Sequence, residues 1–105
     1  MRAAPRSVTR AVPLDTREIE GLGRLLVASG VRGLALLYAP GDGVCYVSNA
    51  RIACLSYEGR RVYSVTWIGG LAEPELGRLD TLADCMSLVL SAIVTDRIDT
   101  LDVSN

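Results

Sequence analysis

The fold of this chain is decided by residues 51–68, which read RIACLSYEGRRVYSVTWI. Two runs rich in β-branched and aromatic residues, 51–57 and 61–68, alternate in polarity on either side of the turn EGR at 58–60. This pattern predicts an antiparallel hairpin. Apolar side chains occur on both sides of the second run, so we expect both faces of the hairpin to be covered.

Further strands are predicted on the N-terminal side of this hairpin. The apolar run 33–39 ends at the turn PGDG and is followed by 44–47, which indicates a buried strand and its return strand. Residues 7–14 alternate weakly and end near Pro13, as expected for an edge strand or an extended arm. The Gly41-Asp42-Gly43 segment is a hairpin turn and no phosphate loop, because the GxxxxGK pattern is absent.

A first helix is predicted from Asp15, because Asp15 and Glu18 have the spacing of a capping box. One apolar face follows at spacings of three and four, formed by Ile19, Leu22, Leu25 and Leu26. Gly30 should end the helix. Gly21 and Gly23 weaken it, and close approach of a neighbouring segment is one reason to keep them.

A second, longer helix is predicted after Glu73-Pro74-Glu75, ending near Arg97. Its apolar stripe comprises Leu76, Leu79, Leu82, Ala83, Met86, Val89, Leu90 and Ile93. Between residues 85 and 94 the helix is apolar almost all round, which indicates burial on more than one side. We therefore predict a dimer or partner interface at Leu82, Met86, Leu88, Val89, Leu90 and Ile93.

Composition places the chain among ordinary globular domains. It has 105 residues, of which 50% are apolar and 22% charged, with a net charge of −1. We expect one α+β domain over 1–105, with 1–6 and 98–105 disordered or frayed: a two-layer antiparallel sheet of four to five strands and two helices packed on one face. No apolar stretch is long enough to cross a bilayer, and no secretory signal is expected at the N-terminus, so we expect a cytoplasmic protein.

The residue types missing from the chain restrict its chemistry. His, Lys, Phe and Gln are absent, and all basic residues are Arg, a usage that suits a GC-rich or thermophilic source. The commonest general base and metal ligand is thus missing, and no Ser has a His to activate it. Asp80 and Asp84 are expected one turn apart on the second helix, where they could form a carboxylate pair or a magnesium site. Without further ligands, a solvated face or a contact with a partner's Arg is favoured. We expect no enzyme, cofactor or metal.

Three cysteines, Cys45, Cys54 and Cys85, lack the CxxC spacing of zinc and redox sites. Buried free thiols are expected, and a Cys45–Cys54 bridge is the alternative. Three arginines, Arg51, Arg60 and Arg61, flank strands that carry Tyr46, Tyr57, Tyr63 and Trp67. These groups could bind nucleic acid by stacking and phosphate contacts, or they could be outward charges above core aromatics.

Residues 52–65, followed by a Gly-containing break and the helix predicted over 76–94, resemble the hairpin and final helix of the small dimerising subunit of the KEOPS tRNA-modification complex. Residues 7–14 and 15–29 match the strand and helix that come first in that family, whereas 31–39 is an extra strand. The resemblance implies a non-catalytic subunit that pairs with itself or a paralogue. It also implies docking on the threonylcarbamoyl transferase, with tRNA contacted through the complex.

A second resemblance competes with the first. Residues 25–29, 30–37 and 44–48 are similar to the opening helix and hairpin of roadblock-type dimerisation domains, which bind small GTPases or motor complexes. That fold has a helix after its second strand, where residues 49–57 here predict a strand. Both resemblances imply a scaffold subunit, and a structural role is our expectation from the sequence.

Overall fold

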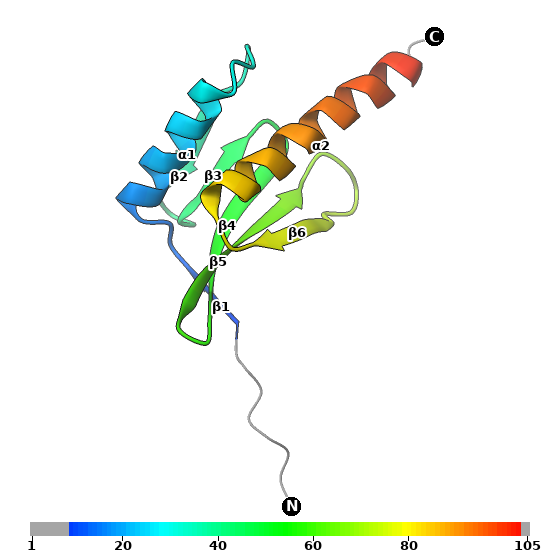
Figure 1. The fold of residues 1–105 in the computed structure, drawn as a ribbon. Helices are drawn as coiled ribbons and strands as arrows, with labels where there is room; N and C mark the ends of the chain where they lie inside the picture. Colours follow the sequence, from blue (N-terminus) through cyan, green and yellow to red (C-terminus); the bar gives the residue numbers. More distant parts are fainter. Residues whose placement is uncertain (1–8, 104–105) are drawn as a thin grey trace, which may run out of the picture.

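The computed structural model describes residues 9–103, with side chains to residue 98, and has two layers (Figure 1). Its elements are β1 (Arg10–Val12), α1 (Thr16–Ala28), β2 (Leu36–Ala39), β3 (Val44–Val47), β4 (Ala50–Tyr57), β5 (Arg60–Trp67), β6 (Glu75–Leu79) and α2 (Leu82–Val103). An antiparallel six-stranded sheet is covered on one face by both helices, so the expected α+β class is confirmed. The predicted disorder of residues 1–6 lies outside the described residues.

The sheet is a meander in the order β2-β3-β4-β5-β6. β1 also pairs with β4, on the same edge as β3 but farther along the strand. The predicted hairpin is β4–β5, with the left-handed backbone of its turn at Glu58 and Gly59. For residues 10–12, the edge-strand prediction is confirmed. In the turn between β2 and β3, a Cβ on Gly43 would lie 2.7 Å from Pro13 Cα, so the absence of a side chain lets the segment before α1 cross this turn.

The core lies between the sheet and the helices. Cys45 faces Ile52, and Ile52 faces Val65, which places these side chains on the helix-covered face. They are fully buried against Leu22 and Val89 of the two helices. Neither helix lies on the opposite face, so within the described residues the helices cover only one of the two hairpin faces that we expected to be covered (Figure 1).

The stretch predicted to begin the second helix is strand β6 instead. Val65 faces Gly77 and Tyr63 faces Leu79, so β6 pairs with the outer side of β5. Gly77 disfavours a helix, and pairing with β5 gives the backbone long-range hydrogen bonds that local sequence patterns do not reveal. A Cβ at Gly77 would lie 3.1 Å from Leu88 Cδ2, so the missing side chain also lets α2 approach the strand.

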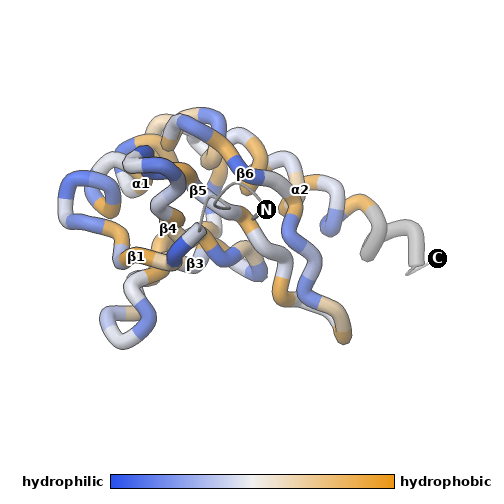
Figure 2. Tube along the Cα trace, turned by 90° about the horizontal axis from the view of Figure 1, so that it is seen from below, coloured by the Kyte–Doolittle hydropathy of each residue, from blue (hydrophilic) through white to orange (hydrophobic). Residues whose placement is uncertain are grey.

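α2 begins at Leu82, after Thr81, whose Oγ1 accepts a hydrogen bond of 3.1 Å from the Asp84 backbone N–H. It continues to Val103, so the predicted end near Arg97 is wrong. In Figure 2, α1 and α2 lie on the same side of the sheet and α2 extends past it. Side chains 94–98 are all exposed. The first half of α2 packs on the sheet, and the second half has no sheet beneath it.

Candidate interaction surfaces

The start of α1 carries the most connected polar group of the described chain. The Asp15 side chain accepts from the Glu18 N–H at 2.8 Å, and Glu18 Oε1 accepts from the Asp15 N–H at 2.9 Å. The predicted capping box is thus confirmed. Glu18 itself is buried, with a side chain only 8% exposed, which is unusual for a carboxylate and requires compensating donors.

Those donors come from β5. Arg61 donates through Nη2 to Glu18 Oε1 at 2.6 Å and through Nε to Oε2 at 3.0 Å, and Tyr63 donates its hydroxyl to Oε2. Arg61 Nη2 also donates to the Pro13 carbonyl at 2.9 Å. Arg61, predicted as a nucleic-acid contact, therefore fastens the β4–β5 hairpin to α1.

This arrangement shifts the pKa values of Glu18, Arg61 and Tyr63. Burial raises the pKa of Glu18, but the hydrogen bonds from Arg61, Tyr63 and the Asp15 backbone outweigh it, so the pKa lies below its usual range. The carboxylate in turn raises the pKa of Arg61. Burial, followed by the same carboxylate, raises the pKa of Tyr63. Glu18 is held ionised with both oxygens occupied, so its role is to join two elements, since a general base needs a free oxygen.

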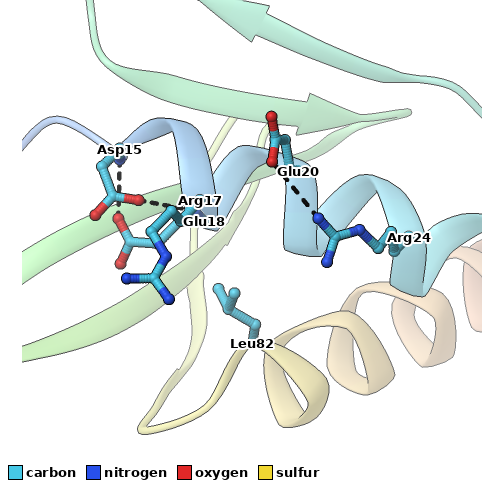
Figure 3. Close-up of a pocket in the computed structure, with 6 residues that line it drawn as sticks. All are labelled: Asp15, Arg17, Glu18, Glu20, Arg24 and Leu82. Carbon is cyan, nitrogen blue, oxygen red and sulfur yellow. Dashed lines mark hydrogen bonds and ion pairs between the residues drawn. The ribbon is translucent and has the colours of Figure 1, made fainter.

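A shallow hollow of about 510 Å³ lies between the starts of the two helices (Figure 3). It is lined by Asp15, Arg17, Glu18, Glu20, Arg24 and Leu82. Leu82 of α2 contacts α1 where Gly21 lies, and a Cβ on Gly21 would be 3.0 Å from Leu82 Cδ1. The close approach that the sequence suggested for Gly21 is therefore made by α2. Leu82 also lines the hollow, so the hollow lies at this contact between the two helices.

The remaining arginines predicted to contact nucleic acid also have carboxylate neighbours. Arg51 lies 3.6 Å from Glu73, and Arg60 lies 3.8 Å from Asp80. Arg60 also lies over the ring of Tyr57, 5.9 Å from its centroid. Asp80 was predicted on the second helix with Asp84, but it precedes α2, which begins at Leu82, and its Arg contact is within the chain.

The aromatic groups expected beside these arginines do not form one platform. The strand register places Tyr46 and Tyr57 on the face away from the helices, and Tyr63 and Trp67 on the helix-covered face. Base stacking needs neighbouring rings on one accessible surface, so the structure divides the predicted set into two halves.

All three cysteines are free and buried, which confirms the predicted buried thiols. In β3, Cys45 faces Ile52 and not Cys54. Burial raises the pKa of Cys45 and of Cys54 to about 11, and that of Cys85 to about 12, so none is a thiolate near neutral pH. Within residues 9–103, no three His, Cys, Asp or Glu side chains are grouped so as to hold a metal ion.

The predicted interface on α2 divides in two. Met86, Val89 and Ile93 are at most 3% exposed within the chain's own core, so they offer no surface to a partner. Leu82, Leu88 and Leu90 are partly buried against that core. We predicted an interface on α2 because we expected a single face of the sheet to cover this helix. In the structure, both the sheet and α1 cover it.

The large apolar side chains that stay exposed fall into two groups. One belongs to α1 and β2 and comprises Val27, Leu37 and Tyr38. The other comprises Leu71, Leu76, Val94 and Ile98, from the β5–β6 connection, β6 and the second half of α2. Beside the second group is a groove of about 360 Å³ lined by Trp67, Leu76, Leu88, Ser91, Ala92, Thr95 and Asp96. Sequence analysis missed both groups, because exposure depends on which strands end the sheet.

No protein-family model, curated protein or solved structure matches this chain. In the part of the chain that the structure describes, neither helix has the length and apolar character needed to span a membrane.

Proposed function

We propose that this chain is a non-catalytic, dimerising subunit of a multiprotein complex. One observation carries the proposal: the large exposed apolar side chains come from two regions, one at β2 and α1 and one at β6, the β5–β6 connection and α2, and β2 and β6 are the two ends of the sheet order. Clustered apolar side chains at a surface mark sites of association. Two separate groups allow one contact with a second copy and another with a different subunit.

The chemistry of the buried groups agrees with such a role. The thiols are uncharged, and the buried carboxylate of Glu18 is engaged by Arg61 and Tyr63. These groups, which could otherwise act as nucleophile or base, are used to hold strands and helices together.

The groove beside α2 is the surface we assign to the heterologous partner. Trp67 and Leu88 line it, and Leu76, which also lines it, is 38% exposed. An aromatic anchor within an apolar groove, with a polar border at Ser91 and Thr95, has the composition of a protein-binding site. Leu88 belongs to the interface predicted from the sequence.

The finer form of the proposal is a cytoplasmic KEOPS-type subunit that docks on the threonylcarbamoyl transferase and supports tRNA modification. Support comes from the resemblance of residues 52–65, here the β4–β5 hairpin, and of the closing helix. Strand β6 between them departs from that pattern. The roadblock alternative is not carried forward, because β3 and β4 are joined by a turn at Ser48 and Asn49 where that fold has a helix.

Purification of the tagged full-length chain from its native source tests the proposal. We expect a defined second subunit, lost when Leu76→Asp and Ser91→Asp are combined, since both residues line the groove and are exposed, and retained in Leu37→Asp, the matched change at the other group. Recovery of the transferase would support the KEOPS form, and a different subunit would reject that form. If no subunit depends on Leu76 and Ser91, the heterologous role assigned to this groove is wrong.

A further inference from the structure

We propose that β2 and α1 together form a self-pairing edge, on which a second copy of this chain binds across a two-fold axis. The inference rests on the proposed dimerising function and says where the dimer forms. β2 is the end strand of the sheet, and α1 contacts both β2 and α2. The sheet and the helix layer therefore end on the same side of the molecule, and one partner can extend both layers.

The two edges of the sheet differ in how they are protected. β6 carries Glu75 and Arg78, and its pairing with β5 is irregular at Val65 and Thr66. Charges and irregular pairing discourage further strand addition. β2 reads LLYA, pairs regularly with β3, and exposes Leu37 by 64% and Tyr38 by 40%. Within residues 9–103, no strand pairs with the outer side of β2, so its backbone can accept another antiparallel strand.

The helix above this edge offers a matching surface. Val27 is 82% exposed, and a shallow hollow of about 760 Å³ is lined by Glu20, Gly23, Arg24, Val27 and Ala28. A Cβ on Gly23 would lie 3.9 Å from Leu36 Cδ2, so this part of α1 lies directly over β2. Because Gly23 and Ala28 are small, a second helix can approach α1 closely.

Charge indicates that the occupant is a second copy. Glu20 and Arg24 lie one turn apart on this side of α1, 3.5 Å from each other, with side chains 58% and 78% exposed. In an antiparallel pair of α1 helices, Glu20 of each copy comes within reach of Arg24 of the other. The same two-fold axis makes two β2 strands antiparallel, so one symmetry operation satisfies the backbone, the apolar side chains and the charges.

The first test measures the mass of the full chain by sedimentation equilibrium over a wide concentration range. We expect a reversible dimer. Leu37→Asp should weaken the dimer by about a hundredfold, because it places a carboxylate at the centre of the pairing strand. Leu71→Asp is the matched control, because Leu71 is exposed but lies in the β5–β6 connection, and it should leave the dimer unchanged. Circular dichroism checks that each variant is folded.

Charge reversal tests the two-fold arrangement itself. Glu20→Arg puts like charges together across the axis and should weaken the dimer by about tenfold, whereas adding Arg24→Glu should restore it. A monomer at all concentrations would overturn the inference, as would a dimer unaffected by Leu37→Asp. Neither result would affect the proposed heterologous role, which is decided by the Leu76 and Ser91 variants. Loss of the second subunit in those variants would not touch the dimer.

Discussion

The two helices cover the same face of the sheet but are attached to it in different ways. α1 buries Leu22 and Leu26 in the core, and it is also fixed by polar contacts at its first turn, where Glu18 accepts hydrogen bonds from Arg61 and Tyr63 of β5. The first half of α2 is fixed by apolar packing of Cys85, Met86, Val89 and Ile93. The polar contacts at the first turn of α1 depend on pH. The apolar packing of α2 does not. Beyond Ile93, the described side chains of α2, residues 94–98, are exposed.

The largest expected effect is at the apolar attachment. Ile93→Ala should destabilise the chain by about 3 kcal/mol, because it removes buried methyl and methylene groups and leaves a cavity between α2 and the sheet. Chemical denaturation at a fixed protein concentration measures this value. A loss below about 1 kcal/mol would mean that α2 is not held by burial.

At the polar attachment, Glu18→Ala should cost about 2 kcal/mol, since it leaves the buried Tyr63 hydroxyl without its acceptor and Arg61 without its carboxylate. Arg17→Ala is the matched control on the same helix. Because Arg17 is exposed, its replacement should be close to neutral. Equal effects of the two changes would contradict an anchoring role for Glu18.

The polar attachment should also make stability depend on pH. The folded pKa of Glu18 is lowered from its ordinary value of 4.5, so its contribution is present above that value and is lost as pH falls through the folded pKa. Glu75, whose pKa is lowered by hydrogen bonds from Ser64 and Arg78, is retained in a Glu18→Gln variant. The difference between wild type and Glu18→Gln in acid unfolding therefore isolates Glu18, and parallel curves would contradict the prediction.

The cap of α2 should contribute less. Thr81→Ala removes the hydroxyl that accepts from the Asp84 N–H, and should cost about 1 kcal/mol. Thr81→Ser retains the hydroxyl and should recover most of the loss. If the serine variant is no more stable than the alanine variant, the cap has no energetic role.

The smallest effect is expected beyond the sheet. Ile98 is 53% exposed, so Ile98→Ala should change the stability of the isolated chain by less than about 0.5 kcal/mol. Hydrogen exchange should be faster at residues 94–98, whose side chains are exposed, than at 85–93, which include the buried positions of the helix. Equal protection of both parts would contradict the difference between the two halves of α2.

Local patterns in the sequence predicted the parts of the fold that depend on neighbouring residues. The capping box at Asp15 and Glu18 and the hairpin around residues 58–60 are set by spacing and turn chemistry, and both are confirmed. Strand β6 was missed, because Pro74 with flanking acids is also typical of a helix start. Its strand structure comes from pairing with β5, a contact between distant residues.

The surfaces were harder to predict for the same reason. An apolar helix indicates burial, but which side chains a short domain buries itself depends on the width of the sheet and on the neighbouring helix. Met86 and Val89 were therefore assigned to a partner and are buried by the chain itself. Arg61 was assigned to nucleic acid because the sequence does not show that Glu18 lies opposite it.

The three core thiols provide a built-in reporter of unfolding. Cys45 lies in β3, Cys54 in β4 and Cys85 in α2, so they sample separate elements of one core. A thiol-specific reagent can reach each one only when that element opens. The rates of labelling, followed by mass, would therefore rank the elements by how often they detach, with no introduced probe.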